Sequence, residues 1–144
     1  MHKLQETEGL LPITAKQIDA ILPFLARFEA VGFSAGSWNM PAGQFRWFDC
    51  EDVVMEFNQS LYDNGWVTPA FDWIEWQESA KEFVDSPKKI ERADAVTIRK
   101  LFTTHSRQNR FCEGHLAAMF ESGHIVALLK RLKTIREEQP RTTY

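Results

Sequence analysis

Residues 104–132, THSRQNRFCEGHLAAMFESGHIVALLKRL, hold two helical patterns and most of the unusual polar residues of the chain. The first pattern predicts a helix over residues 110–122, because its apolar residues recur at the spacing of one helix face. Gly123 is the glycine expected just after a helix ends, and a second helix is predicted over residues 124–136. The apolar face of the first helix consists of Cys112, Leu116 and Met119.

A glycine lies inside the first predicted helix. Glycine in a helix interior costs about 1 kcal/mol relative to alanine, so Gly114 indicates that something approaches the backbone closely there. The neighbour can be another helix, since small residues are common at helix crossings, or it can be a ligand or a partner's side chain. The sequence leaves both readings open.

The second predicted helix has an apolar stripe, which indicates that it packs on the core, and a basic opposite face. If residues 124–136 were the recognition helix of a helix-turn-helix, apolar Ile125, Leu128 and Leu129 would occupy positions that must bind base edges. The sequence therefore argues against base-specific DNA binding and leaves nonspecific phosphate contact open. The basic face consists of Lys130, Arg131, Lys133 and Arg136.

The composition is that of one globular domain. The chain has 144 residues, of which 44% are hydrophobic and 26% charged, enough for a core that needs no disulfide or metal. It lacks the run of about 18 apolar residues that spans a membrane, and its first residues lack the apolar segment of a signal peptide. Two cysteines are too few for a disulfide framework and suit a reducing compartment. We therefore expect a soluble, cytoplasmic protein without membrane contact.

The net charge of −3 is unevenly distributed. Residues 1–94 carry 8 basic and 16 acidic side chains, whereas residues 95–136 carry 8 basic and 2 acidic ones. These parts can attract each other within the fold or within an antiparallel dimer, or the basic part can face an acidic partner such as nucleic acid. The first reading is favoured, because free nucleic-acid binders usually carry an overall basic surplus.

Local signals before residue 104 predict further helices. Thr14 and Gln17 form a capping box that begins a helix, Pro23 kinks or restarts it, and Gly32 closes it. Three more helices are predicted to begin at aspartate N-caps. These N-caps are Asp49, Asp72 and Asp94.

Between the first two helices the helical periodicity fails. Two short extended segments, residues 36–40 and 44–48, are predicted to form a hairpin around a turn at residues 41–43. The aromatic rings of this segment can line a pocket or can form a lid over the core. The candidate pocket residues are Trp38, Arg46 and Trp47.

Together these patterns predict an all-α fold with a small β-hairpin near residues 36–48. Five or six helices are expected to pack around one aromatic-rich core. Residues 1–144 form a single domain in this reading, with a loose lead-in over residues 1–13 and a frayed tail over residues 137–144.

One set of residues in the second half of the chain forms a recognisable pattern. It consists of Phe71-Asp72-Trp73, Arg107, Arg110-Phe111, Glu113-Gly114, Leu116, Ser122-Gly123 and Arg131-Leu132. This pattern resembles a family of small bacterial and archaeal proteins of unknown function. The resemblance covers roughly residues 45–135 and implies a shared helical fold without an assigned activity. The first positions to test are therefore Arg107, Arg110, Phe111, Glu113 and Gly114.

Cysteine and histidine residues raise the question of metal or nucleophilic chemistry. Cys112 and His115 stand three residues apart, but strong zinc signatures pair two such doublets, and the other candidates are single residues. A thiolate nucleophile paired with His115 or His105 would need an exposed cysteine, whereas Cys112 is predicted on an apolar face. No metal, cofactor or catalytic residue is therefore predicted, and phosphate-loop and nucleophile-elbow motifs are absent from the sequence. The single candidates are Cys50, His105 and His124.

A polar set near the start of the 110–122 helix suggests anion binding. Arg107 and Arg110 can clamp a carboxylate or phosphate, with Glu113 orienting them. The alternative is an ordinary ion network on a helix surface. The full candidate ligand set is Trp38, Arg46, Trp47, Arg107, Arg110, Glu113, Gly114 and Glu121.

The sequence favours a non-enzymatic interaction module. Its basic last helix and acidic amino-terminal portion would bind another protein or a second copy of the chain. The alternative is a small-anion-binding protein or an enzyme with a pocket around Arg107, Arg110 and Glu113. Nucleic acid is the least favoured partner. Convergence of these side chains in a cleft would separate the two main readings.

Overall fold

The structure is a computed structural model that describes residues 12–43 and 45–139. Most of the predicted lead-in and the end of the predicted tail lie outside these residues. The last helix, α9 (His124–Glu138), continues to Glu138, so the part of the tail that begins at residue 137 is helical at first. Its C-cap is Gln139.

The amino-terminal helix begins and breaks where local signals predict. The Thr14 side chain accepts from the amide of Gln17, and the Gln17 side chain accepts from the amide of Thr14, so both halves of the capping box are present at α2 (Ala15–Ile21). Proline cannot donate to a helix, and the chain restarts after Pro23 as α3 (Phe24–Phe28).

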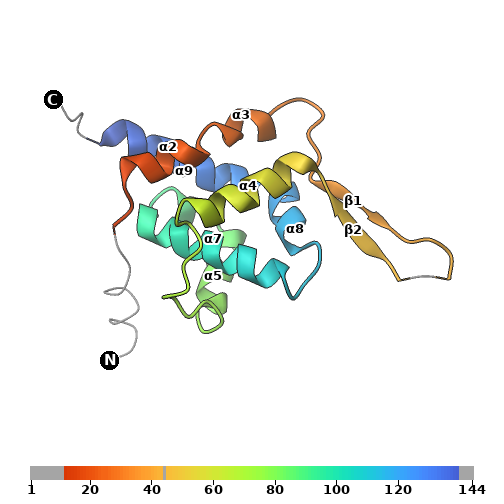
Figure 1. The fold of residues 1–144 in the computed structure, drawn as a ribbon. Helices are drawn as coiled ribbons and strands as arrows, with labels where there is room; N and C mark the ends of the chain where they lie inside the picture. The colour runs from red at the N-terminus through yellow and green to blue at the C-terminus, as the bar shows by residue number, and fades with distance from the viewer. Residues whose placement is uncertain (1–11, 44, 140–144) are drawn as a thin grey trace.

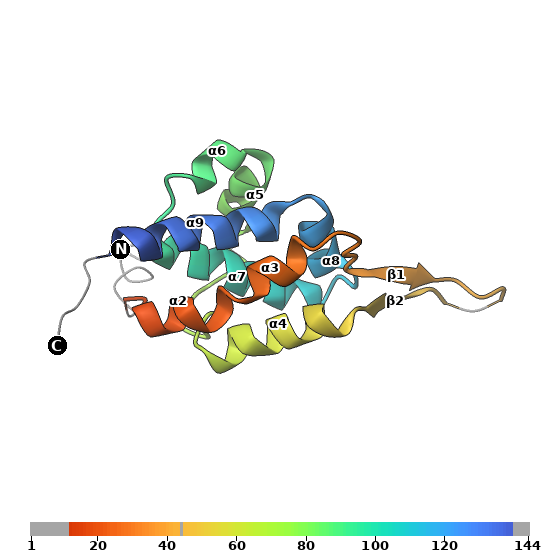
Figure 2. The ribbon, with the colours of Figure 1, turned by 90° about the horizontal axis from the view of Figure 1, so that it is seen from above.

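The predicted hairpin is present. β1 (Gly36–Asn39) and β2 (Trp47–Cys50) pair antiparallel, with Trp38 opposite Phe48. The second strand begins later than the predicted 44–48 because the register follows the Trp38–Phe48 ring pair, whose centroids lie 5.2 Å apart, and this lengthens the connecting loop. We call residues 36–43 and 45–50 the arm, since they project away from the helices (Figures 1 and 2).

Two of the three predicted aspartate caps require correction. Asp49 lies in β2, where it accepts from the indole N–H of Trp47, and the N-cap of α4 (Asp52–Asp63) is Glu51. Asp72 accepts from the amide of Glu75, but this makes a turn. The α-helix itself starts later, as α5 (Gln77–Asp85), and the residues directly after it form α6 (Pro87–Ile90).

The predicted helix over residues 110–122 is wrong. α7 (Ala95–Asn109), capped by Asp94 as predicted, ends at Asn109, and α8 (His115–Glu121) begins after a turn. Gly114 has φ +84°, a left-handed conformation that stops a helix, and the Asn109 side chain accepts from the amide of Leu116. Cys112 is therefore exposed in the turn, and its prediction as a buried apolar residue is also wrong.

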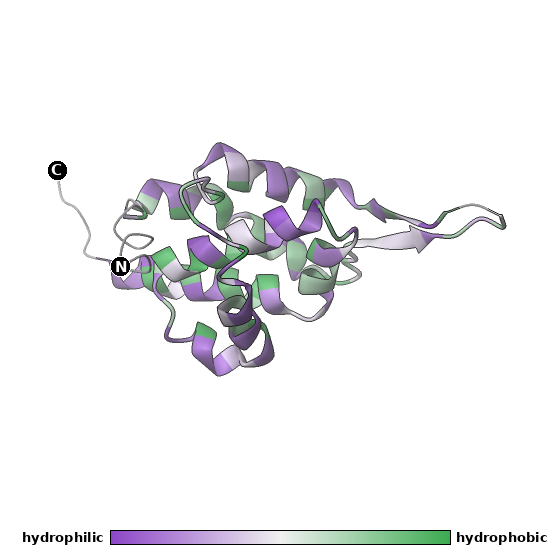
Figure 3. Cartoon of the chain, turned by 90° about the horizontal axis from the view of Figure 1, so that it is seen from below, coloured by the Kyte–Doolittle hydropathy of each residue, from purple (hydrophilic) through white to green (hydrophobic). Residues whose placement is uncertain are grey.

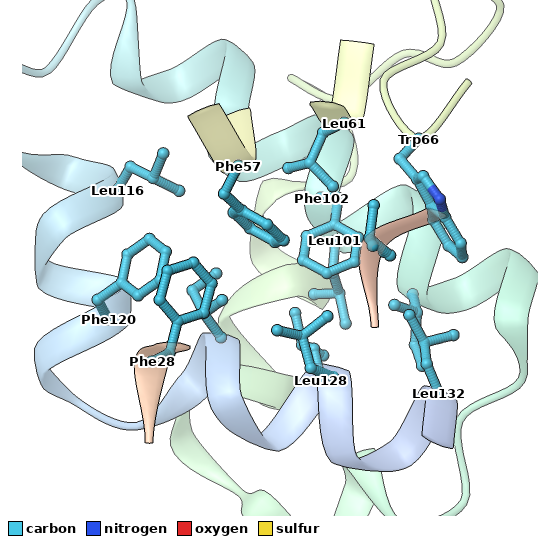
Figure 4. Packing of buried hydrophobic residues seen from close by; sticks show 14 of the residues in the cluster. Phe28, Phe57, Leu61, Trp66, Leu101, Phe102, Leu116, Phe120, Leu128 and Leu132 are labelled. Carbon is cyan, nitrogen blue, oxygen red and sulfur yellow. The ribbon is translucent and has the colours of Figure 1, made fainter. Parts of the chain in front are cut away.

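The core is aromatic, as the composition predicts. The ring of Phe57 lies near the centre, with ring-centroid distances of 5.1 Å to Phe28, 5.8 Å to Phe102 and 5.9 Å to Phe120, all edge-to-face (Figure 4). α9 contacts α2, α3, α6, α7 and α8, so it crosses much of the helical body (Figure 2). Hydrophobic and hydrophilic residues alternate along these helices, as expected when one face is buried (Figure 3).

Candidate functional sites at the arm and at a histidine chain

The sequence predicted a close neighbour at Gly114, and this neighbour is the indole ring of Trp38 in the same chain. A Cβ atom at position 114 would lie 2.6 Å from Cζ2 of Trp38, well inside van der Waals contact. The glycine therefore serves two purposes, the left-handed turn and the space for the indole. Trp38 reaches the turn before α8 from β1, and so fixes the base of the arm against the helical body.

A carboxylate makes the second connection between the arm and the helices. Glu113 Oε2 accepts from the backbone N–H of Phe48 at 2.8 Å. This N–H belongs to the strand edge that faces away from β1, where an unpaired donor would otherwise remain. The prediction that Glu113 orients Arg107 and Arg110 finds no support, because no ion pair joins them in the described part of the chain.

The eight predicted ligand residues therefore separate into two groups. Five of them lie on or against the arm, where the guanidinium carbon of Arg46 also lies 4.2 Å from the centre of the Trp38 ring. Across residues 12–43 and 45–139, no side-chain hydrogen bond or ion pair joins the other three to one another. The first group is Trp38, Arg46, Trp47, Glu113 and Gly114, and the second is Arg107, Arg110 and Glu121.

The arm exposes apolar side chains to an unusual degree. Phe45 is 94% exposed and Met40 is 70% exposed near its tip. Trp38 and Trp47 retain 41% and 39% exposure at its base. Clustered apolar exposure of this kind marks interaction sites on soluble proteins. No third strand accompanies β1 and β2 among the described residues.

The basic face of α9 is partly used within the chain. Lys130 pairs with Glu29 at 3.2 Å, and Arg136 pairs with Asp19 at 2.9 Å. The guanidinium of Arg131 donates to the carbonyl of Ala93 at 2.8 Å. These contacts join the basic last helix to the acidic amino-terminal portion of the same molecule. Each pair is partly exposed, so it adds little stability but reduces the charge offered to a partner.

Three histidines from three helices form a hydrogen-bonded chain. His105 of α7 contacts His115 of α8 through Nδ1, with a distance of 3.1 Å to Nε2. Through its other nitrogen, Nε2, it contacts Nε2 of His124 of α9 at 3.0 Å. His105 and His124 are buried, and His115 is half-buried. We call this set the histidine chain.

The histidine chain has a fixed proton count when all three rings are neutral. A neutral imidazole carries one N–H, so His105 donates through one nitrogen and accepts through the other. The chain therefore runs in one of two directions, and reversing it moves the proton on every ring. At its inner end, Nδ1 of His124 is buried without a hydrogen-bond partner among the described residues.

Burial keeps these rings neutral. Desolvation lowers the pKa of His105 well below its usual value of 6.5, and the neighbouring His124 and His115 lower it further. The pKa of His124 falls to about 4, chiefly by burial and secondarily by His115. Burial also lowers the pKa of His115. All three imidazoles are therefore uncharged at neutral pH.

A pocket of about 320 Å³ opens beside the outer end of the histidine chain. It lies between α5, α7 and α8, and His105 and His115 form part of its wall. Nδ1 of His115 takes no part in the chain, so it is the one nitrogen of the half-buried ring left for another partner. The remaining polar wall residues are Gln77, Glu78, Lys81, Asp85, Thr104 and Gln108.

The two cysteines have different surroundings. Burial, then the charges of Asp49 and Glu113, raise the pKa of the Cys50 thiol, which disfavours the thiolate. Cys112 is exposed, as a nucleophile requires, but its thiol makes no hydrogen bond with a histidine ring among the described residues. Within residues 12–43 and 45–139, no three His, Cys, Asp or Glu side chains converge as metal ligands. In the histidine chain the ring nitrogens face one another in sequence.

Comparison with known families decides the family of the chain. Residues 13–138 match the family of unknown function DUF6508. The chain belongs to the DUF6508 family. The match confirms the resemblance to a family without assigned activity and extends it to the amino-terminal helix, which the resemblance had left out. Neither the curated proteins nor the solved structures contain a match.

In this DUF6508 chain, the sequence predicted the hairpin of the arm, but it did not predict that the three histidines contact one another. Each histidine was a candidate by itself, but their mutual contact depends on where α7, α8 and α9 cross. The signal that was available is the position of His105 in an apolar stripe, where a polar ring needs a partner. None of the described helices is long and apolar enough to cross a membrane.

Proposed function

We propose that the protein is a non-enzymatic interaction module that binds an extended, apolar segment of a partner protein along the arm. The observation that carries the proposal is the exposure of Trp38, Met40, Phe45 and Trp47 on a hairpin that is braced to the body. Water alone is a poor environment for four such side chains.

The bracing supports a binding role. A two-stranded hairpin is marginally stable by itself in water. Here the Trp38–Gly114 contact and the Phe48–Glu113 hydrogen bond hold its base while its tip stays clear of the helices. A surface that is held in place before binding loses less conformational entropy when a partner arrives.

The strand edges and the charges indicate the kind of partner. On the outer edge of β2, the N–H of Phe48 already donates to Glu113. The outer edge of β1 has no strand partner in the described residues, because β1 pairs only with β2 there. An extended segment can add to the β1 edge through main-chain hydrogen bonds and place alternate apolar side chains against the rings. Exposed Arg46 favours an acidic residue in that segment.

The proposal moves the binding surface away from the basic face of α9. Lys130 and Arg136 already pair with acidic side chains of the same chain. A protein that bound there would have to compete with these contacts, whereas a protein that bound the arm would cover apolar side chains that are exposed in the described part of the chain.

The test is selection of short peptides from a random 12-residue display library on the purified protein. Enriched peptides should alternate apolar residues and contain Asp or Glu. Their affinity should fall at least tenfold for the double variant Met40→Ser, Phe45→Ser, whose exposed side chains contribute little to folding. Met55→Ser removes an exposed apolar side chain from α4 and is the matched control, with no expected change.

Two results would overturn the proposal. One is the absence of any enriched peptide, or equal binding by the parent and the double variant. The other is a concentration-dependent dimer in sedimentation experiments that the double variant abolishes, because the arm would then be covered by a second copy of the chain.

A further inference from the structure

The pocket beside the histidine chain is lined by three charged side chains that are exposed to solvent and take part in no ion pair among the described residues. Glu78, Lys81 and Asp85 follow one another at helical spacing along α5 and line the pocket. No hydrogen bond or ion pair engages their side chains in residues 12–43 and 45–139. By contrast Glu82, on the same helix but outside the pocket, pairs with Lys89 at 2.6 Å.

The histidine chain is the second observation that points to a ligand. Burying neutral imidazoles costs stability, and Nδ1 of His124 remains buried without a partner among the described residues. Titratable groups held in this way beside a cleft are typical of binding or catalytic sites.

We infer that this pocket binds a small organic cation, an amine with a short apolar body, whose ammonium group donates to Nδ1 of His115. The two carboxylates outnumber Lys81, and the histidines are uncharged, so the wall is net negative and favours a cation over an anion. The apolar body would lie against the apolar part of the wall, which consists of Ala80, Val84 and Met119.

Binding at this nitrogen would set the direction of the histidine chain. An ammonium donor at Nδ1 of His115 leaves the ring proton on Nε2, which donates to Nδ1 of His105. His105 must then donate through Nε2 to His124, whose own proton therefore lies on Nδ1. A ligand in the pocket thus determines the tautomer of His124, a buried ring that lies two hydrogen bonds away from His115.

The experiment uses three probes with one apolar body, n-pentylamine, n-pentanol and pentanoate, titrated into the labelled full-length protein. NMR spectra of the histidine rings and of the Met119 methyl group report binding and tautomers. Only pentylamine should shift both His115 and Met119, and His124 should carry its proton on Nδ1 in the bound protein.

Charge variants on α5 test the same inference. Replacing both pocket carboxylates, Glu78→Gln with Asp85→Asn, should weaken pentylamine binding about tenfold. Glu82→Gln, outside the pocket, should leave it unchanged. All three residues are exposed, so the variants retain the fold.

Three outcomes would overturn the inference. The first is no shift of His115 or Met119 with pentylamine. The second is an equal response to pentanol or pentanoate, which would describe an apolar hollow without charge selection. The third is a bound state in which His124 carries its proton on Nε2. Each outcome leaves the proposed role of the arm untouched, because the arm contributes no residue to this pocket.

Discussion

The arm and the histidine chain depart from the usual distribution of side chains in opposite directions. On the arm, apolar rings such as Phe45 and Trp47 face solvent. In the histidine chain, polar rings such as His105 and His124 are buried among helices. Apolar exposure and polar burial both lower stability relative to an ordinary surface and an ordinary core.

The arm and the histidine chain also differ in the contacts that hold them in place. The arm is fixed at its base by one close contact at Gly114 and one hydrogen bond from Glu113. The histidine chain is held between three helices, α7, α8 and α9, and only its outer end at His115 borders a pocket. Changes at the arm should therefore act locally, whereas changes at the histidine chain should affect the stability of the whole helical body.

Acidification should produce the largest effect. The folded-state pKa of His124, about 4, lies below the value of 6.5 for an exposed histidine. As the pH falls through 6.5, the unfolded chain binds protons that the folded protein excludes, so the free energy of unfolding decreases until the pH reaches about 4. His124 alone should contribute a loss of about 3 kcal/mol between pH 7 and pH 4, and His105 acts in the same direction.

Urea unfolding at several pH values measures this loss. The double variant His105→Leu, His124→Leu is the comparison, because it keeps the carboxylates that also respond to acid. A smaller pH dependence in the variant is expected. If the free energy of unfolding fell equally steeply with pH in the parent and the variant between pH 6.5 and pH 4, the buried histidines would not cause the loss of stability.

Gly114→Ala should have the next largest effect. Alanine in a left-handed conformation costs about 1 kcal/mol, and here its Cβ also displaces the Trp38 ring, so a total loss of about 2 kcal/mol is expected. Gly123→Ala is the matched control, since Gly123 has φ +83° with no atom within 4 Å of the added Cβ. Chemical unfolding and tryptophan fluorescence measure both variants. Equal losses of unfolding free energy in the two variants would mean that the position of the Trp38 ring does not depend on the space at Gly114.

Glu113→Ala should have a smaller effect. It removes the acceptor for the Phe48 N–H and should lower the free energy of unfolding by about 1 kcal/mol. Hydrogen exchange at the Phe48 amide should become faster while exchange in the helical core stays the same. Glu121→Ala, an exposed carboxylate on α8, provides the control. Unchanged exchange at Phe48 would show that the arm base is held without this bond.

Phe45→Ser should have the smallest effect on stability. Its side chain is 94% exposed, so the free energy of unfolding should change by no more than about 0.5 kcal/mol. The matched comparison is Phe57→Ser at a position with 0% exposure, where a large loss is expected. A substantial destabilisation by Phe45→Ser would show that the tip of the arm packs against something, contrary to its description as free surface.

Local sequence signals predicted many element boundaries correctly. The capping box at Thr14, the break at Pro23, the cap at Asp94 and the stop at Gly123 all act through neighbours within a few residues. The all-α fold with a small hairpin followed from the same kind of information. The prediction over residues 110–122 failed because helical spacing alone cannot distinguish a continuous helix from a turn that a distant ring selects.

The amino-acid sequence by itself determined the helical class, the aromatic core and the existence of the arm, because periodicity and turn chemistry are properties of neighbouring residues. Only the tertiary structure decided that Trp38 fills the space at Gly114 and that Glu113 binds the arm. It also decided that His105, His115 and His124 touch. These contacts depend on the crossing of elements far apart in the chain, and packing geometry sets such crossings.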